Sequence, residues 1–494
     1  MRKVLATWVA GCFLTGCAGG AVAPKGASGP VEAASAEKAD KGEKAGKGEK
    51  ADDVKAAQAD DGPRAAGPWV GAAPVSDVLL AGTAADTQIG VWVDVPTAIA
   101  QSARPPANVA LVVDTSGSMA GLRIVNARHA ARAFVDNLAD GDIVSLISFD
   151  DIASERLPPT QLAPHTRPAV ARAIESLRAA GGTNLFDGLR LGEARAATSP
   201  PTHLVRRVVL LSDGRANVGP ANPAVLGEVA RRGAERGVQV TSLGVGEGYD
   251  ETTLNALAVA SSGRLYHIDE AGETASILER ELALLRSTAV TDAFLEIVPA
   301  PGVELRSVDG APAMSTGTGL RVPLGAMFAG QHREMLVRAR VYGRPAAESG
   351  SPLALASVRL HFRDSAEGGL ERVHEVVTRY RWSDDPAAVG ASTNGKVQTI
   401  AAALESGQAA VEAARRMNEG DFRAAEQKLA EAEARMRDRA ARATSADEKK
   451  RANTIASSMA QARTTARAAA AAPPAGRRSS ALRVNDAAMD TMGY

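Results

Sequence analysis

The sequence of 494 residues is poor in several residue types on which common functions depend. Its two cysteines, Cys12 and Cys17, both lie within the first twenty residues, so the rest of the chain has neither disulfide nor thiol. Aromatic residues make up only 3% of the chain, which leaves few side chains to stack on nucleobases or sugars. The 57 basic and 57 acidic residues cancel, and this balance argues against nucleic acid as the main partner.

Patterns typical of enzymes are also missing. The seven histidines lie singly along the chain, without the spacing of zinc ligands. There is no Gly-Lys-Ser/Thr phosphate loop, and "GVGEGYD" (Gly244 to Asp250) has only part of the glycine spacing of a dinucleotide fingerprint. In "GSMAG", Ser118 does not lie centrally between two glycines as the serine of a nucleophile elbow does. Because no nucleophile is paired with an identified base, we expect no catalysis.

A short apolar stretch from Val4 to Leu14 follows the basic residues Arg2 and Lys3. It is too short to span a bilayer, and its basic start and small following residues are typical of a secretory signal. The sequence "LTGC", ending at Cys17, resembles the lipobox of bacterial lipoproteins. This resemblance implies cleavage before Cys17 and lipidation of that residue. Since no aspartate follows the cysteine, it also implies attachment to the outer membrane of the cell envelope.

Residues 18–66 consist mainly of Ala, Gly, Lys, Glu and Asp, with almost no large apolar side chain. Such a segment cannot bury enough apolar surface to offset the entropy lost on ordering. Its acids match its lysines, so the segment is not a polybasic membrane-binding patch. We therefore predict a signal peptide over residues 1–17 and a disordered tether over residues 18–66.

Apolar runs alternate with helical patterns between residues 105 and 286. The runs are Asn108 to Asp114, Asp142 to Phe149, Val205 to Asp213, Val238 to Gly246 and Gly263 to Asp269. The helical patterns are Leu122 to Leu138, Pro168 to Leu177, Leu185 to Ala197, Pro223 to Glu235, Glu251 to Ala260 and Thr274 to Leu285. This alternation predicts an α/β domain over residues 105–286, with a doubly wound parallel sheet.

Oxygen donors gather where the expected strands end. Asp114, Ser116 and Ser118 alternate in a turn, Thr183 follows a Gly-Gly pair, and Asp213 closes another strand. Ligands of this fold bind at the carboxyl ends of the strands, so we expect these side chains at one solvent-facing edge, outside the core. Two carboxylates there repel each other unless a positive charge lies between them. Few charges and several hydroxyls suit Mg²⁺ better than zinc, with Mn²⁺ or Ca²⁺ as substitutes.

At these five positions the sequence resembles the von Willebrand factor type A family. The metal-ion-dependent adhesion site of that family combines an Asp-x-Ser-x-Ser loop with a distant threonine and a distant aspartate, and all five residues match in type and order. The resemblance implies that Ser116 and Ser118 bind the metal directly, and that the two aspartates bind largely through water. It implies that Thr183 shifts between direct and water-mediated contact. An acidic residue of a partner protein would fill the remaining coordination position.

Strand-like stretches flank the α/β region on both sides, two within residues 67–104 and six within residues 287–383. Turn residues separate them at intervals typical of a β-sandwich. Because isolated hairpins are marginally stable, we expect the early strands to join the later ones in one sandwich that the α/β domain interrupts. This arrangement is similar to integrins and to bacterial surface proteins of the inter-alpha-trypsin inhibitor heavy-chain type. A separate amino-terminal domain is the alternative, although about forty residues are few for one.

Residues 384–472 are helical in pattern. The expected helices are Gly395 to Glu405, Ala409 to Glu419, Asp421 to Ala440 and Asp447 to Ala470. The middle pair resembles a single tetratricopeptide-like hairpin, and one such repeat does not build a solenoid. A small helical bundle and a partner-binding arm both stay open. Residues 473–494 are predicted to be a disordered tail.

These features predict a lipid-anchored cell-envelope protein, not an enzyme, whose α/β domain binds a protein ligand through a divalent cation. Two alternatives stay open. In the first, the metal only stabilises a structural envelope protein. In the second, the metal is the Lewis acid of a hydrolase, which the lack of histidine in the five ligand segments disfavours.

Overall fold

The structure, a computed structural model, describes residues 69–493 apart from residues 83, 98–104, 214, 246–248, 269–270 and 344–350. The predicted signal peptide, Cys17 and the predicted tether lie outside the described residues. Within the described part of the chain, no helix combines the length and the apolar character needed to cross a membrane.

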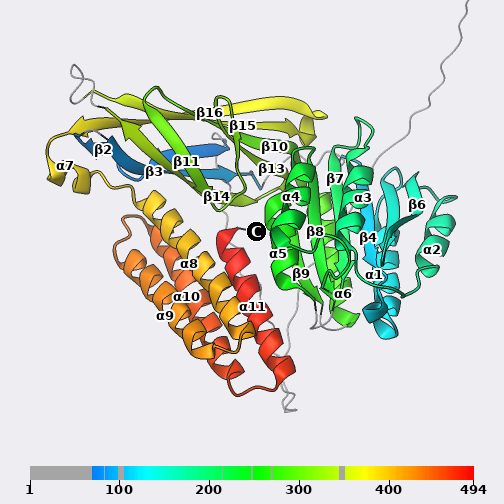
Figure 1. The fold of residues 1–494 in the computed structure, drawn as a ribbon. Coiled ribbons are helices and arrows are strands. Elements are labelled where there is room, and N and C mark those ends of the chain that lie inside the picture. Colours follow the sequence, from blue (N-terminus) through cyan, green and yellow to red (C-terminus); the bar gives the residue numbers. More distant parts are fainter. Residues whose placement is uncertain are drawn as a thin grey trace, which may run out of the picture. The chain divides into compact units, whose positions relative to one another are not determined.

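A six-stranded sheet forms the centre of the α/β domain (Figure 1). The strand order is β6-β5-β4-β7-β8-β9, and every neighbouring pair is parallel except β5 and β6. The strands are β4 (Ala107–Asp114), β5 (Ile143–Phe149), β6 (Ala153–Gln161), β7 (Val205–Ser212), β8 (Val238–Val245) and β9 (Arg264–Ile268). Strands β4 and β8 are buried at every position, as expected when helices cover both faces of a sheet. The predicted α/β class is confirmed.

Helices pack on the two faces of this sheet and form two separate apolar clusters. The first face carries α1 (Leu122–Asn137), α2 (Arg167–Glu175) and α6 (Ala271–Arg286). The second carries α3 (Leu185–Ala197), α4 (Pro223–Ala234) and α5 (Glu251–Ser261). Helices α3, α4 and α5 each begin at an asparagine or aspartate whose side chain accepts a bond from a backbone N–H of the first turn. These caps fix where the helices start at the carboxyl edge of the sheet.

The edge strand β6 was not predicted from the sequence. It contains Pro158 and Pro159, and only Leu157 along its length is buried. Proline cannot donate to a strand ladder, so it is tolerated at a sheet edge, where one side of the strand has no partner. Because most of its side chains face solvent, β6 lacks the apolar run by which the other strands were found.

Two further sheets are built from strands that precede and follow the α/β domain in the sequence. One has the order β1-β3-β14-β11, and the other β12-β13-β10-β15-β16-β2. Their bounds are β1 (Val70–Pro74), β2 (Val78–Leu80), β3 (Ala84–Asp94), β10 (Thr288–Pro299), β11 (Val303–Asp309), β12 (Met314–Thr316), β13 (Gly319–Phe328), β14 (His332–Tyr342), β15 (Leu353–Asp364) and β16 (Leu370–Ser383). Neighbours are antiparallel except β2 and β16. The assignment of these sheets to the β-sandwich class stays a prediction.

Strands from before and after the α/β domain pair directly with each other. Strand β3 pairs with β14 in an unbroken register from Asp94–His332 to Ala84–Tyr342. Where the chain enters and leaves the domain, Val95 N donates to Gln331 O (2.9 Å) and Ala329 N donates to Ser287 O (2.9 Å). Apolar side chains from both sheets belong to one buried cluster. The α/β domain is therefore connected through both of its ends to the same turn, between β13 and β14.

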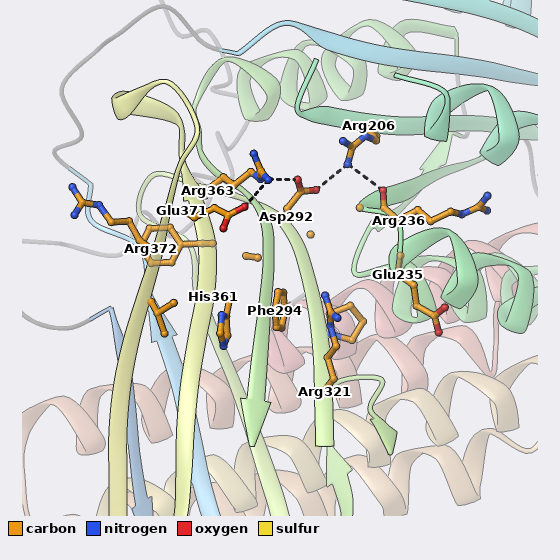
Figure 2. Close-up of a pocket in the computed structure, with 17 residues that line it drawn as sticks. Arg206, Glu235, Arg236, Asp292, Phe294, Arg321, His361, Arg363, Glu371 and Arg372 are labelled. Carbon is orange, nitrogen blue, oxygen red and sulfur yellow. Dashed lines mark hydrogen bonds and ion pairs between the residues drawn. The ribbon is translucent and has the colours of Figure 1, made fainter. Parts of the chain in front are cut away.

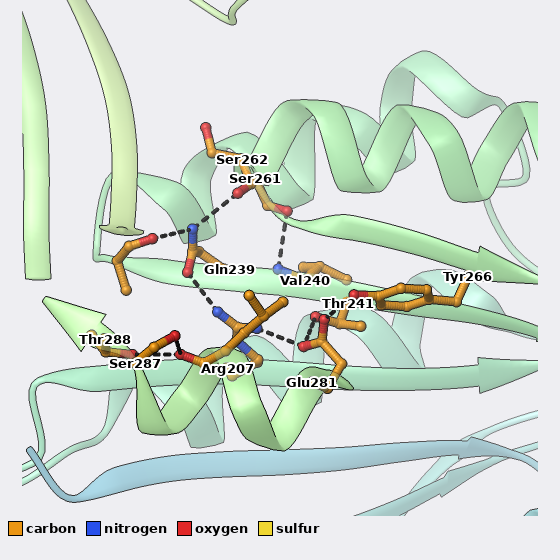
Figure 3. Close-up of polar contacts among 12 residues, drawn as sticks. Arg207, Gln239, Val240, Thr241, Ser261, Ser262, Tyr266, Glu281, Ser287 and Thr288 are labelled. Carbon is orange, nitrogen blue, oxygen red and sulfur yellow. Dashed lines mark hydrogen bonds and ion pairs between the residues drawn. The ribbon is translucent and has the colours of Figure 1, made fainter. Parts of the chain in front are cut away.

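A buried polar network lies near the amino ends of β7 and β8 (Figure 3). Arg207 Nη1 lies 2.6 Å from Glu281 Oε2, and only 2% and 1% of the two side chains are exposed. Gln239 accepts a bond from Arg207 Nη2 (3.0 Å) and donates through Nε2 to the carbonyls of Ser262 (2.9 Å) and Ala326 (3.2 Å). Since Ala326 belongs to β13, the network links the α/β domain to the neighbouring sheet.

Five helices complete the described chain: α7 (Pro386–Ala391), α8 (Gly395–Asn418), α9 (Phe422–Ala441), α10 (Ala446–Ala469) and α11 (Pro474–Met492). The last four lie side by side (Figure 1) around one cluster rich in alanine. The two helices predicted over Gly395 to Glu405 and Ala409 to Glu419 form one continuous helix, α8. Gly407 does not end a helix but gives room to α11, because a Cβ there would lie 2.4 Å from Met492 Cγ.

The prediction of a disordered tail over residues 473–494 is wrong, since α11 covers most of it. Its buried residues include Leu482 and Val484, which lie in the apolar cores of the α/β domain and of the helices, respectively. Asn255 Nδ2 of α5 donates to Asn485 Oδ1 (2.9 Å). These partners lie far away in the sequence, so the order of this segment depends on tertiary contacts that its own residue pattern does not reveal.

Candidate metal site

The predicted site lies where β4 ends and a short 3-10 helix, Gly117–Met119, begins. Asp114 Oδ1 accepts a hydrogen bond from Ser116 N (2.8 Å), and Oδ2 accepts one from Ser212 Oγ (2.6 Å). Asp114 is 0% exposed, so the expectation that it faces solvent outside the core is wrong. The carboxylate is instead held from two sides before any cation or ligand contacts it.

Asp213 joins the same group of donors from the end of β7. The hydroxyls of Ser116 and Ser118 lie 3.0 Å apart, and Ser118 Oγ donates to Asp213 Oδ1 (2.8 Å). Hydrogen bonds therefore connect four of the predicted ligands, Asp114, Ser116, Ser118 and Asp213, in an unbroken chain.

Thr183 reaches this edge through its loop. Gly117 N donates to Gly181 O (2.9 Å), which ties the loop before Thr183 to the loop of the two serines. Thr183 N donates to Asn217 Oδ1 (2.7 Å), and the residue is buried. Among the described residues, no hydrogen bond joins the Thr183 hydroxyl to the other four predicted ligands. The structure thus brings its loop to the site and leaves the hydroxyl outside the bonded chain.

The electrostatics of the site favour a bound cation. Burial raises the pKa of the Asp114 carboxyl above its ordinary value. Hydrogen bonds from Ser116 and Ser212 lower this pKa, and the nearby charge of Asp213 raises it again. A buried carboxylate with a second carboxylate close by is stabilised by positive charge placed between them.

One positive charge is already present. Arg123 Nη1 lies 2.5 Å from Asp213 Oδ2 and 3.1 Å from the Ser118 carbonyl oxygen. Neither Arg123 nor Ser212 was predicted from the sequence to belong to the site. Arg123 lies in the first turn of α1, where long side chains point back towards the helix start, and this rule could have placed it at the site.

The donor set fits a hard divalent cation. Within the described residues, no group of three or more His, Cys, Asp or Glu side chains forms an alternative metal cluster. The site instead combines two carboxylates with three hydroxyls, the oxygen donors that Mg²⁺ and Mn²⁺ prefer. Asp114, Ser116, Ser118, Thr183 and Asp213 are the residues that would hold such an ion.

Comparison with known proteins yields matches over the α/β domain. The family model of the von Willebrand factor type A domain matches residues 108–280. The uncharacterized protein sll0103 of Synechocystis sp. is 32% identical over 216 residues, which are 44% of this chain and 50% of that protein. Human inter-alpha-trypsin inhibitor heavy chain H3 is 29% identical over 175 residues, or 34% of this chain and 20% of that protein. The matched part of the chain thus spans half or less of the length of these relatives.

Two solved structures resemble more of the chain. The von Willebrand factor type A protein from Catenulispora acidiphila has a TM-score of 0.64 at 19% identity and covers 85% of this chain and 96% of its own. The ArnB paralog VWA2 from Sulfolobus acidocaldarius has a TM-score of 0.58 at 15% identity, and the match covers 85% of this chain and 97% of that chain. At these identities the likeness concerns the fold alone. It extends beyond the α/β domain to most of the described chain.

Proposed function

Since residues 108–280 form a von Willebrand factor type A domain, we propose that the protein binds a protein ligand through a divalent cation held by this domain. Domains of this family typically mediate protein–protein interaction. The observation that carries the proposal is the hydrogen-bonded chain from Asp114 through Ser116 and Ser118 to Asp213, which holds two carboxylates and two hydroxyls at one edge. We propose a role in binding and not in catalysis, since no histidine lies in the ligand segments to act as a general base.

The surface around the site supports a protein ligand. Leu122, directly after the serine loop, is 78% exposed, and Ile152, next to the carboxyl end of β5, is 65% exposed. Asp151 Oδ1 accepts a bond from Gly182 N (2.9 Å), so the Ile152 loop adjoins the Thr183 loop. Large exposed apolar side chains beside a cation suit a partner that presents an acidic residue flanked by aliphatic ones.

The first test is calorimetric titration of the EDTA-treated protein with Mg²⁺. We expect Asp114→Asn to weaken binding by at least about 100-fold, or about 2.8 kcal/mol, because it removes one of the two charges that attract the ion. The matched control is Asp140→Asn, whose side chain is 54% exposed and pairs with Arg167 away from the site. Equal Mg²⁺ affinity in the wild type and in Asp114→Asn would contradict the assignment.

Arg123→Gln provides a variant with the opposite expected effect. The guanidinium and a divalent ion compete for the Asp213 carboxylate, so removing the guanidinium should strengthen Mg²⁺ binding by roughly 3- to 10-fold. A weaker affinity in this variant would show that Arg123 supports the bound state instead.

Affinity capture from an envelope extract then tests for the protein ligand. A partner that wild type retains in Mg²⁺, and that is lost in EDTA and in Asp114→Asn, supports the proposal. If Mg²⁺ raises the melting temperature but no captured partner depends on Mg²⁺, the metal only stabilises a structural envelope protein.

The cellular location is a proposal that rests on the sequence. We propose that Cys17 carries a lipid that attaches the protein to the outer membrane of a bacterial envelope. Replacing Cys17 with serine should move most of the protein from the membrane fraction to the soluble fraction, because the protein would then lack the lipid that attaches it. Fractionation of cells measures this, and unchanged membrane association would point to a protein partner or an uncleaved signal as the membrane attachment.

A further inference from the structure

A cavity of about 380 Å³ lies between the α/β domain and the strands that follow it (Figure 2). The end of α4 and the start of β7 form one wall, and β10, β13, β15 and β16 form the other. Arg206, at the amino end of β7, lines it, whereas Asp213 of the metal site follows the carboxyl end of the same strand. The cavity is therefore at the edge of the sheet opposite the metal site, and its volume suits a small ligand.

The acidic groups of this cavity already have cationic partners. Asp292 Oδ1 lies 2.9 Å from Arg206 Nη1, and its Oδ2 lies 3.5 Å from Arg363 Nε. Glu371 lies 2.6 Å from Arg363 Nη2. Glu235 pairs at 2.5 Å with an arginine of its own helix. None of the three carboxylates is thus available to neutralise the remaining arginines of the cavity.

Among the described residues, one guanidinium group of the cavity lacks a carboxylate partner. Arg321 forms no ion pair with any described residue and lies over the ring of Phe294, 3.7 Å from the ring centroid. The side chain of Arg236 extends away from Arg321 and Phe294 (Figure 2), and its guanidinium lies 3.7 Å from the carboxyl of Glu193.

The local structure holds the Arg321 guanidinium in place. Phe294 contacts Arg321 and also stacks on His361, with ring centroids 4.6 Å apart and an interplanar angle of 3°. Figure 2 shows the three side chains in a row across β13, β10 and β15. A guanidinium already ordered on an aromatic ring loses less conformational freedom when it binds an anion.

The backbone around Asp292 is also adapted to this cavity. Asp292 has a φ of 51°, in the left-handed region that residues with a side chain rarely adopt, at a bulge of β10. Gly237 opposite it has a φ of 73°, and a Cβ there would lie 2.4 Å from Asp292 Oδ1. Both features leave room for the carboxylate of Asp292 against the α/β domain, which keeps Arg206 and Arg363 turned towards it.

We propose that this cavity binds a small organic anion bearing a carboxylate or phosphate group, with Arg321 as its charged hydrogen-bond donor. Arginine suits both groups because its planar fork matches their oxygen spacing. Phe294 and His361, which line the cavity, provide apolar contacts for the uncharged part of the ligand through their ring edges. The proposal is independent of the metal site.

The test uses the whole protein in EDTA, titrated with inorganic phosphate or with citrate while NaCl keeps the ionic strength constant. Calorimetry should show saturable binding of at least one of the two probes, weakened at least about tenfold in Arg321→Gln. Arg442→Gln is the control, because its side chain is 73% exposed directly after α9. Binding of phosphate alone assigns a phosphate ligand, and binding of citrate alone assigns a carboxylate ligand.

Equal affinities in wild type and Arg321→Gln would overturn the proposal, as would the absence of saturable binding of both probes to wild type. Arg321→Lys separates a lost charge from damaged folding. It keeps the charge but not the planar fork, so it should bind more weakly than wild type and more strongly than Arg321→Gln. If the lysine and glutamine variants bind equally well, the charge at this position does not contribute and the proposal fails.

Discussion

Replacing Glu281 with alanine should destabilise the protein by about 3–5 kcal/mol, the usual effect of removing one partner of a buried ion pair. The Arg207 guanidinium would remain buried, with Gln239 as an uncharged partner. The hydroxyls of Thr241 and Tyr266 would also lose their acceptor, since they donate to the two carboxylate oxygens at 3.0 Å and 2.7 Å. Chemical denaturation followed by circular dichroism measures the free energy of unfolding.

Two further variants make this prediction specific. Asp136→Ala removes an ion pair whose two side chains are 43% and 47% exposed, so it should change the free energy of unfolding by less than about 1 kcal/mol. Replacing Arg207 with methionine and Glu281 with leucine together should restore much of the stability lost in Glu281→Ala, because no unpaired charge stays buried. A loss below about 1 kcal/mol in Glu281→Ala would show that water reaches Arg207.

Glu193→Gln should stabilise the protein at alkaline pH, by on the order of 3 kcal/mol at pH 9. Burial raises the folded-state pKa of Glu193 from 4.5 to about 8, so the folded protein binds this proton more tightly than the unfolded chain. The stability of wild type therefore falls as the pH rises from about 4.5 to about 8 and then levels off. Glutamine does not ionise, so the variant lacks this decrease.

Unfolding curves at several pH values between 5 and 9 measure the difference. The matched control is Glu405→Gln, whose side chain is 53% exposed and which should leave the pH profile of wild type unchanged. Parallel profiles of wild type and Glu193→Gln would mean that Arg236, at 3.7 Å, keeps Glu193 ionised in the folded protein.

The sequence predicted that Asp114 and Asp213 lie at one edge because parallel strands fix where their carboxyl ends lie. Asp114 and Asp213 each end an apolar run, and neighbouring strands β4 and β7 bring them to one edge. Spacing did not reveal that Asp114 is buried, since its burial depends on Ser212 from another strand. Arg123 was missed although its position in the first turn of α1 directs its side chain towards the serine loop, because its partner Asp213 lies 90 residues away in the sequence.

The fold, too, was predicted where local residue patterns determine it and not where contacts between distant segments do. Helices with clear caps and apolar stripes were predicted within a few residues, as for α3 and α4. Strand β6 and helix α11 were not, because β6 faces solvent at an edge and α11 depends on contacts with α5 and α8. Local pattern predicts an element when its own residues supply the buried face, and fails when distant segments decide its burial.

The pairing of β3 with β14 has a consequence for the order of folding. His332 and Asp94 are hydrogen-bonded partners 238 positions apart, and closing so long a loop from an unfolded chain costs about 5 kcal/mol in entropy. Val95 and Ser287, at the two ends of the α/β domain, both bond to the turn between β13 and β14. A folded α/β domain therefore holds its ends close together, and its own local contacts offset most of this entropy cost. We therefore expect the inserted domain to fold first and the surrounding sheets to close last.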